Sequence, residues 1–98
     1  MRHACVYIMS NKSHRVYVGA TVDLVRRVHQ HKSGTYPNGF TARYKFGRLV
    51  YFEVLDSYRA ALAREKYLKG LLRRRKVELI QRDNLDLSVR FEDLLMAR

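Results

Sequence analysis

Five side chains of the types used in phosphoryl chemistry lie between positions 7 and 65 of the chain: Tyr7, Tyr17, Arg27, His31 and Glu65. A carboxylate can hold Mg²⁺ or Mn²⁺, because Mg²⁺ keeps much of its water shell and often binds through one or two carboxylates. A guanidinium can clamp a phosphate with a fork geometry that lysine lacks. With a metal ion to stabilise the leaving oxygen, such a set could hydrolyse a phosphodiester.

Each of these residues also has a purely structural interpretation. Glu65 falls on the apolar stripe of an expected helix, where a carboxylate is costly unless it pairs with a nearby Arg or Lys or binds a cation. Arg27 could be an internal strut, and His31 a surface residue at a helix end. Tyr7 and Tyr17 could simply pack. The separate residues leave both interpretations open, and only their convergence in one cleft favours chemistry.

The first element that must position these residues is a hairpin. Residues 5–9 and 15–19 are rich in β-branched and aromatic residues and flank a polar stretch, which predicts two antiparallel strands. If the loop is centred on Lys12, Tyr7 lies opposite Tyr17, and both phenols project from one face. The opposite face is then lined by Val6, Ile8, Val16 and Val18.

A helix is expected directly after the hairpin. Thr21 or Asp23 can cap it, and it continues to about Lys32. Arg26 and Gln30 point away from the core. The inward stripe consists of Leu24, Arg27, Val28 and His31.

A third strand and another helix follow. Residues 48–55 predict a strand, Asp56 and Ser57 can cap a helix that runs to about Lys69, and Gly70 marks its end or a joint. The inward stripe of this helix is predicted to consist of Tyr58, Ala61, Leu62, Glu65, Leu68 and Leu72.

Charge is the outstanding property of the composition. The chain has 98 residues with 20 Lys and Arg against nine Asp and Glu, for a net charge of +11. Such a balance predicts an anionic partner, and nucleic acid is the commonest one. Residues 1–48 carry nine basic groups against one acid, and residues 64–76 carry seven against one. A solvated charge run is the alternative for Arg73 to Lys76 alone, but two basic blocks favour a binding surface.

The length predicts one domain with one modest core. We expect it to span residues 1–82, ending in a helix over 73–82, with residues 83–98 as a C-terminal helical extension packed on the same domain. A short helix is expected there from Ser88 to about Met96. The longest apolar run has six residues, too few to cross a membrane. The single Cys5 cannot form an internal disulfide, so a reducing cytoplasm is the simplest compartment.

The chain resembles the GIY-YIG nuclease superfamily in its two triplets, Cys5-Val6-Tyr7 and Tyr17-Val18-Gly19. It is most similar to small standalone bacterial members, which are like the catalytic domain of the excinuclease C subunit. The resemblance runs from about Ala4 to Ile80, and the patterns YVGAT-x-DL-x-RR-x-x-x-H and A-x-x-R-E-K-x-L-K make it specific. It implies an α+β fold, with a three-stranded antiparallel sheet flanked by helices and a catalytic cleft on one sheet face. It further implies metal-dependent cleavage of DNA.

The resemblance also implies a role for each of the five residues. Glu65 matches the glutamate that binds Mg²⁺ or Mn²⁺, and Arg27 matches the arginine that contacts phosphate. Tyr17 matches the tyrosine proposed to activate the attacking water, and Tyr7 the one that helps to orient water and phosphate. His31 matches the helix histidine, an alternative base or phosphate contact.

Four positions depart from the family pattern, and two of them, Val6 and Val18 in place of isoleucine, keep the strand character. Cys5 stands where the first triplet has glycine, and Ala20 stands where many members carry a basic residue. The phosphate contact of that basic residue must therefore come from elsewhere or be absent.

Contacts to the nucleic acid are expected from two further sets of residues. Aromatic side chains alternate with basic ones around a Pro-Asn-Gly turn, an arrangement that can stack unpaired bases, although the loop could also fold onto its own aromatics. This set consists of Tyr36, Phe40, Arg43, Tyr44 and Lys45. The second set consists of Arg26, Lys32, Lys69, Arg73 and Arg74.

The leading hypothesis is a cytoplasmic, nucleoid-associated, metal-dependent DNA endonuclease that favours single-stranded or locally unpaired DNA. One alternative is a non-catalytic module that binds DNA or RNA. Another is a subunit of a repair complex that needs an unidentified protein partner.

Overall fold

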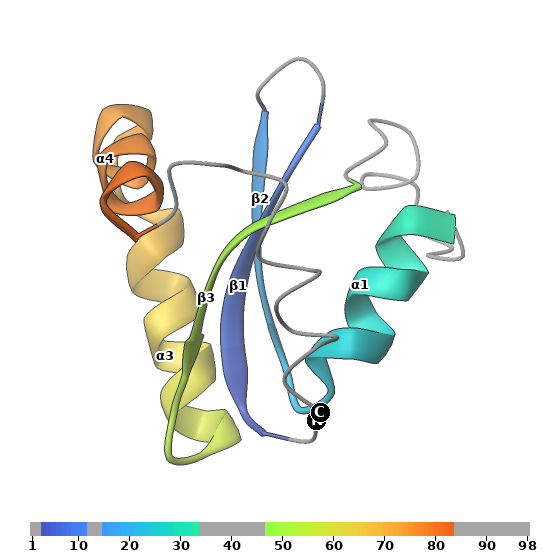
Figure 1. Ribbon diagram of the computed structural model, residues 1–98. Coiled ribbons are helices and arrows are strands. Elements are labelled where there is room, and N and C mark those ends of the chain that lie inside the picture. Colours follow the sequence, from blue (N-terminus) through green and yellow to red (C-terminus); the bar gives the residue numbers. More distant parts are fainter. Residues whose placement is uncertain (1–2, 12–14, 34–46, 84–98) are drawn as a thin grey trace.

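The computed structural model describes residues 3–11, 15–33 and 47–83, which form a three-stranded antiparallel sheet with helices on both faces (Figure 1). The strands are β1 (Cys5–Ser10), β2 (Val16–Thr21) and β3 (Arg48–Val54), in the order β2-β1-β3. The helices in these ranges are α1 (Leu24–Ser33), α3 (Tyr58–Lys69) and α4 (Arg73–Asp83). The predicted α+β architecture is therefore confirmed. None of these helices is long and apolar enough to cross a membrane.

The register of the β1–β2 hairpin differs from the predicted one. Tyr7 lies opposite Gly19, and Met9 lies opposite Tyr17, whereas the sequence predicted Tyr7 opposite Tyr17. That prediction was wrong by two residues. A shift of two residues leaves every side chain on its predicted face, because strand side chains alternate between faces. Both phenols therefore still project from one side of the sheet.

Gly19 explains why this register is the stable one. A Cβ atom built on Gly19 would lie 2.5 Å from the Tyr7 Oη atom and 2.6 Å from Cζ. The Tyr7 ring thus lies over β2 at Gly19, the position that has no side chain. Any residue larger than glycine would have to displace the ring.

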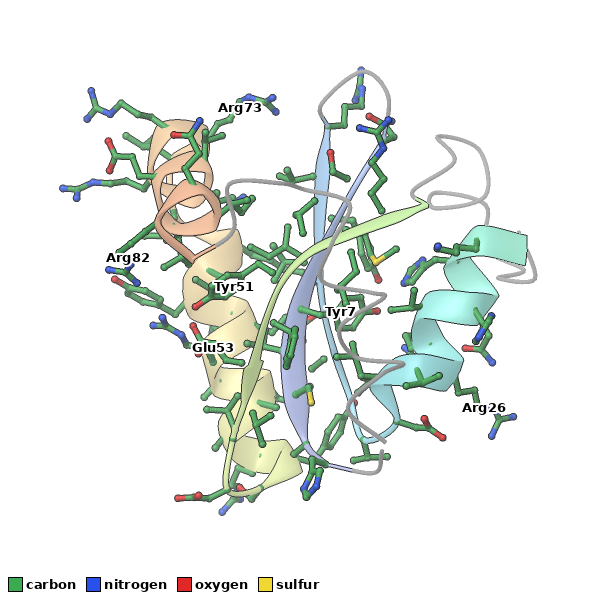
Figure 2. All side chains as sticks on the ribbon, in the orientation of Figure 1. Tyr7, Arg26, Tyr51, Glu53, Arg73 and Arg82 are labelled. Carbon is green, nitrogen blue, oxygen red and sulfur yellow. The ribbon has the colours of Figure 1, made fainter. Side chains whose placement is uncertain are left out.

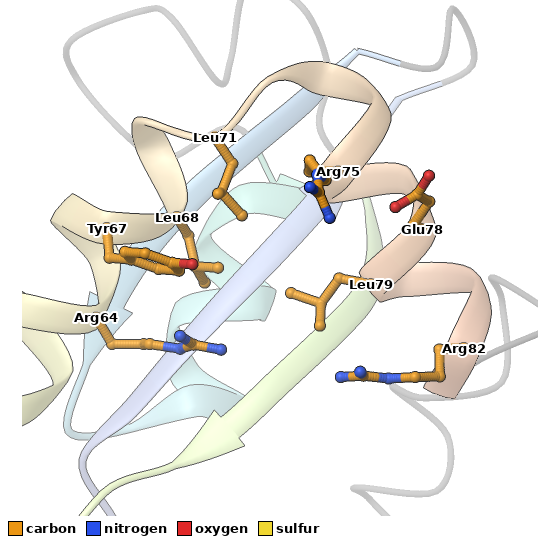
Figure 3. Close-up of a pocket in the computed structure, with 8 residues that line it drawn as sticks. All are labelled: Arg64, Tyr67, Leu68, Leu71, Arg75, Glu78, Leu79 and Arg82. Atoms are coloured by element: carbon orange, nitrogen blue, oxygen red, sulfur yellow. The ribbon is translucent and has the colours of Figure 1, made fainter.

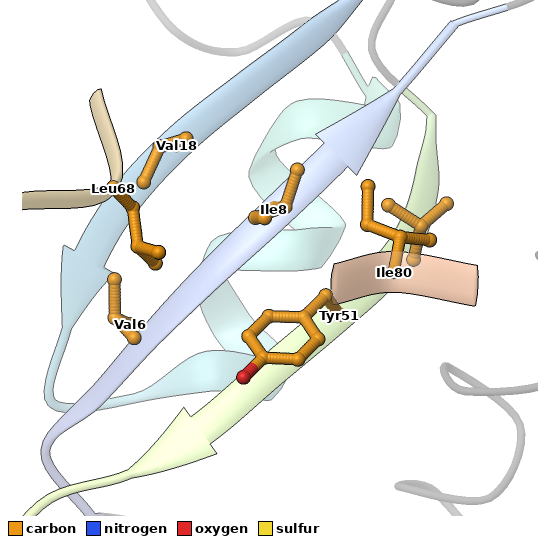
Figure 4. Close-up of a cluster of buried hydrophobic side chains, with 7 residues drawn as sticks. Val6, Ile8, Val18, Tyr51, Leu68 and Ile80 are labelled. Atoms are coloured by element: carbon orange, nitrogen blue, oxygen red, sulfur yellow. The ribbon is translucent and has the colours of Figure 1, made fainter. Parts of the chain in front are cut away.

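Two apolar clusters form the core, one on each face of the sheet. The face toward α1 contains Cys5, Tyr7, Met9, Leu24, Val28 and Leu49. The face toward α3 and α4 contains Val6, Ile8, Val18, Val50, Tyr51, Leu68 and Ile80 (Figure 4). Val16 packs against the second cluster, so the predicted apolar face of the hairpin is confirmed. The sheet thus separates two apolar layers, each covered by its own helices.

Side-chain caps start both helices that flank the sheet. The Asp23 carboxylate accepts a hydrogen bond from the Arg26 backbone N–H at 3.2 Å, and α1 begins at the next residue after Asp23. The Ser57 hydroxyl oxygen accepts from the Ala60 N–H at 3.0 Å. Such caps satisfy backbone donors that the first helical turn leaves unpaired. Both capping residues were candidates in the sequence.

The predicted inward stripe of α3 was partly wrong. Ala61 and Leu68 are buried, but Tyr58, Leu62 and Leu72 are exposed. Leu72 lies beyond the helix, which ends at Lys69 before the Gly70 cap.

The reason for this difference is a contact between α3 and β3, which the helical periodicity of the sequence does not reveal. Arg64 pairs with Glu53 on β3, with 2.9 Å between Nη2 and Oε2. This pair and the burial of Leu68 set the rotation of α3 about its own axis. The helix therefore presents Arg64, rather than Leu62, toward the sheet. The predicted helix from Ser88 to Met96 lies outside the described residues.

Candidate active site

Three of the predicted site residues, Tyr7, Tyr17 and His31, meet on the α1 face of the sheet. They come from β1, β2 and α1, respectively. The Tyr7 Oη and His31 Nε2 atoms are 2.9 Å apart. The ring centroid of Tyr17 lies 6.4 Å from that of Tyr7 and 5.3 Å from that of His31. Figure 2 shows Tyr7 on the side of the sheet that faces α1.

The members of this cluster differ in their access to solvent. Tyr7 is fully buried and His31 is 2% exposed, whereas Tyr17 is only partly buried. A water or a substrate can therefore contact Tyr17 more readily than the other two. Tyr7 and His31 are the buried members of the cluster, and their hydrogen bond fixes its position against the sheet.

His31 is electrically neutral at ordinary pH. Burial lowers the pKa of its imidazole to about 4, and the positive charge of Arg27 contributes in the same direction. A neutral imidazole has one donor and one acceptor nitrogen. The Tyr7–His31 hydrogen bond can therefore run in either direction, depending on the tautomer of the imidazole. One of these directions leaves His31 as the acceptor of the phenolic proton.

Arg27 lies one helical turn before His31 and is partly buried, as its place in the inward stripe predicted. It lines a hollow of about 310 Å³ together with Arg26, Gln30 and Thr21. The lining also includes the carboxylate of Asp23, so two guanidinium groups face one acid and leave a net positive charge that suits an anion such as phosphate.

Gln30 and Thr21 were not singled out from the sequence as site residues. Gln30 could have been found, because it lies three and four residues after the two arginines and so shares their helix surface. Thr21 carries no such signal. Its place in the hollow depends on how β2 meets α1.

Glu65 lies apart from the aromatic cluster. It belongs to α3, which covers the opposite face and packs along β2 and β1. Its side chain is 19% exposed and pairs with Lys69, with 2.8 Å between Oε2 and Nζ. Of the two explanations for this carboxylate, the structure thus contains the ion pair. The edge strand β2 nevertheless carries Tyr17 and is also contacted by α3, the helix of Glu65.

The described residues contain no group of three or more His, Cys, Asp or Glu side chains that could hold a metal ion. A structural zinc site needs four such ligands. Mg²⁺ requires fewer, since it is commonly held by one or two carboxylates, waters and substrate phosphates. Glu65 therefore fits a hydrated Mg²⁺ or Mn²⁺ ion and does not fit zinc.

The predicted nucleic-acid contacts fall on two sides of the molecule. Arg26 and Lys32 are exposed on α1, the helix that also carries His31. Arg73 and Arg74 are exposed on α4, and Lys69 is 53% exposed on α3, and these two helices cover the other face of the sheet (Figure 1). The predicted stacking loop, Tyr36, Phe40, Arg43, Tyr44 and Lys45, lies outside the described residues.

A partly buried polar network on the α3 face was not predicted from the sequence. The Tyr51 hydroxyl donates to the Glu53 carboxylate, which also accepts from Arg64: Nε–H is shared between both carboxylate oxygens, and Nη2 donates to Oε2. Burial raises the pKa of Glu53, but the hydrogen bonds from Arg64 and Tyr51 outweigh it, and the pKa is lowered overall. The network ties α3 to β3. Arg64 stands in the A-x-x-R-E-K pattern, which was its only signal.

Residues 3–78 match the family described as the GIY-YIG catalytic domain. The chain belongs to the GIY-YIG family. The two family triplets lie in the paired strands β1 and β2, and Tyr7 of the first triplet lies against Gly19 of the second triplet. That contact is a physical reason for glycine at the end of the second triplet.

Small proteins of the same kind are similar to this GIY-YIG chain. A UPF0213 protein of Clostridium perfringens is 40% identical over 79 residues, which cover 76% of this chain and 80% of that protein. A UPF0213 protein of Syntrophus aciditrophicus is 33% identical over 78 residues, covering 80% and 90%. The solution NMR structure of a UPF0213 protein of Bacillus halodurans has a TM-score of 0.52 and 31% identity, covering 84% and 86%. The fold is therefore of the nuclease type.

Proposed function

We propose that this protein is a divalent-metal-dependent endonuclease that hydrolyses DNA phosphodiester bonds. The observation that carries the proposal is the contact of Tyr7, Tyr17 and His31 on one sheet face of a GIY-YIG chain. Burying a histidine beside a positive charge is costly, and perturbed titratable groups of this kind are enriched at functional sites. The net charge of +11 supports DNA as substrate and the nucleoid as its place of action.

Tyr17 is the residue that contacts the attacking water in this proposal, because it is the least buried ring of the cluster. Tyr7 and His31 are positioning residues: their hydrogen bond holds the Tyr7 ring against β2 and so supports the Tyr17 ring beside it. Arg27 binds a substrate phosphate from the neighbouring hollow. The proposal thus assigns the base to Tyr17 and a supporting role to His31.

Glu65 is the proposed ligand of Mg²⁺ or Mn²⁺. The ion, when bound, would stabilise the negative charge that develops on the leaving oxygen. The Lys69 ammonium is the present partner of Glu65, and helix pairs four residues apart contribute only about 0.3–0.5 kcal/mol. A divalent cation can therefore replace the ammonium at little cost. The proposed position of the scissile phosphate is the edge at β2, because this strand carries Tyr17 and α3 packs along it.

The test is a cleavage assay with labelled single-stranded, duplex and branched DNA and with RNA, in Mg²⁺, in Mn²⁺ and in EDTA. We expect cleavage of DNA only with metal, and the fastest cleavage on unpaired strands. Glu65→Gln should lower the rate by about 100-fold or more, as the loss of a group that stabilises transition-state charge typically does. Asp56→Asn, an exposed carboxylate between β3 and α3 that lines neither hollow, is the matched control and should keep the wild-type rate. An unchanged rate in Glu65→Gln would remove Glu65 as the metal ligand.

A second candidate function is a non-catalytic nucleic-acid-binding module. The Glu65–Lys69 ion pair and the separation of Glu65 from the aromatic cluster favour it. Ala20, which replaces the basic residue of many family members, favours it as well. Binding that weakens steeply with salt, without nicking in either metal, would select this function over the enzyme.

A further inference from the structure

A groove between α3 and α4 lies on the far side of the sheet from the aromatic cluster (Figure 3). Its volume is about 580 Å³, within the roughly 300–1,000 Å³ of typical ligand sites. Leu68, Leu71 and Leu79 give it an apolar floor. The proposed phosphodiester chemistry uses none of these residues.

The walls of the groove are cationic. Arg64 and Arg82 extend toward one another from the facing helices, and Arg75 adds a third guanidinium (Figure 3). Arg64 pairs with Glu53, whose pKa the nearby charge of Arg82 also lowers, and Glu78 is the acidic residue of the lining. Arg75 is exposed, and no carboxylate of the described residues pairs with it. The groove therefore keeps a positive excess that an anion can use.

An exposed aromatic ring completes the site. Tyr67 is 58% exposed, although a tyrosine of this size is usually better covered. The Arg64 guanidinium lies over the ring, with 5.1 Å from Cζ to the centroid. A ring supported in this way by a guanidinium is a ready platform for a flat, polarisable partner.

We propose that this groove binds an unpaired nucleotide of a nucleic-acid strand, with its base stacked on Tyr67 and its phosphates beside Arg75 and Arg82. Open aromatic rings combined with arginines are the means by which proteins hold single strands without reading their sequence. The α3–α4 groove would then hold a strand on the face of the sheet opposite the aromatic cluster. This binding goes beyond the proposed function, and it is expected whether or not the protein cleaves DNA.

The test measures binding in EDTA, so that cleavage does not enter the result. A labelled oligothymidylate of about 12 nucleotides is titrated and followed by fluorescence anisotropy, beside a duplex of equal length. Tyr67→Leu should weaken binding of the single strand by about tenfold, the effect of losing one stacked base, and should leave the duplex unchanged. Tyr58→Leu, another exposed tyrosine of α3 that does not line the groove, is the matched control and should bind as wild type does.

The arginines are tested through the salt dependence. In the double variant Arg75→Gln/Arg82→Gln, the slope of log Kd against log salt should fall by about 0.7 for each phosphate that the variant no longer neutralises. Arg59→Gln, which replaces an exposed residue of α3 outside the groove, should change the slope by less than half as much as the double variant does. Circular dichroism melts of all variants verify that each remains folded.

Two results would overturn the proposal. One is equal single-strand affinity in Tyr67→Leu and Tyr58→Leu. The other is binding of an acidic peptide of alternating glutamate and leucine that disappears in Arg75→Gln/Arg82→Gln while oligothymidylate binding is unchanged. The second result would make the groove a site for a protein partner.

Discussion

The close approach of Tyr7 to Gly19 makes Gly19→Ala the most demanding test of this structure. The added Cβ atom would lie 2.5 Å from Tyr7 Oη, whereas ordinary contacts begin at 3.4 Å, so the ring must retreat by about 0.9 Å. It has little room to do so, because Tyr7 is fully buried and its hydroxyl is already 2.9 Å from His31 Nε2. Either the ring compresses the core or the hydrogen bond breaks.

The expected loss of stability combines these two costs. Forcing extra volume into a packed core typically costs about 1–3 kcal/mol. Leaving a buried hydrogen-bonding group unsatisfied costs about 1–3 kcal/mol. The two costs do not add in full, because breaking the hydrogen bond lets the ring relieve part of the compression. We therefore expect Gly19→Ala to lower the free energy of unfolding by about 2–4 kcal/mol. Such a loss is a large share of the stability of a domain of this size.

Urea unfolding followed by circular dichroism measures this loss, and a second substitution tests its cause. Tyr7→Phe should not rescue Gly19→Ala, because the ring carbon Cζ would still lie 2.6 Å from the new Cβ atom. Tyr7→Leu should rescue it, and the double-mutant cycle should give a favourable coupling energy. The matched control is Gly47→Ala, whose Cβ atom would meet nothing within 4 Å.

Two results would refute the reasoning about Gly19. One is a Gly19→Ala variant as stable as Gly47→Ala. The other is full rescue by Tyr7→Phe, which would make the hydroxyl alone responsible.

Two further predictions concern the titratable side chains of His31 and Glu53. The pKa of His31 is lowered to about 4, mainly by burial and further by the Arg27 charge. The stability that depends on a neutral His31 is therefore fully present above the ordinary pKa of 6.5, and it is lost as the pH falls toward 4. His31→Gln should remove up to about 3 kcal/mol of that pH dependence, measured as urea midpoints from pH 7 to pH 4. Glu53→Gln should lower the free energy of unfolding by about 1–2 kcal/mol, because it weakens the hydrogen bonds from Arg64; solvent screening at this partly exposed arginine keeps the loss modest. The pKa of Glu53 is lowered overall, so its contribution is fully present above its ordinary pKa and should decline as the pH falls below that ordinary value.

Matched controls exist for both predictions. His29→Gln replaces an exposed histidine of the same helix and should leave the pH dependence unchanged. Glu78→Gln removes an exposed carboxylate of α4 and should change stability by less than about 0.5 kcal/mol. If His31→Gln keeps the wild-type pH profile, the buried neutral imidazole is not its source. If Glu53→Gln and Glu78→Gln are equally stable, the Arg64 pair does not anchor α3.

The elements and their buried faces could be predicted because the signals are local. Alternation along residues 5–9 and 15–19 placed Tyr7 and Tyr17 on one face in the predicted register, and the observed shift of two residues keeps them there. Caps at Asp23 and Ser57 placed the starts of two helices within a residue or so. The candidate cluster of Tyr7, Tyr17 and His31 is the product of these faces.

The arrangement of those elements depended on contacts between residues far apart in the chain. The register was decided by the Tyr7 ring fitting over Gly19, and the rotation of α3 by the pairing of Arg64 with Glu53. Neither contact leaves a periodic trace in the sequence. For Glu65 to meet the tyrosines as predicted, α3 would have to cover the sheet face that carries Tyr7 and Tyr17. The structure instead places α3 along β2 on the opposite face.

The sequence by itself therefore determined which residues can do chemistry, which of them share a sheet face, and that the expected partner is anionic. Only the tertiary structure decided which ring of the cluster reaches solvent, which charges neutralise each other and where a second cationic groove opens. The reason is that alternation and helical periodicity report one element at a time. Exposure, ion pairing and grooves are properties of surfaces that two elements make together.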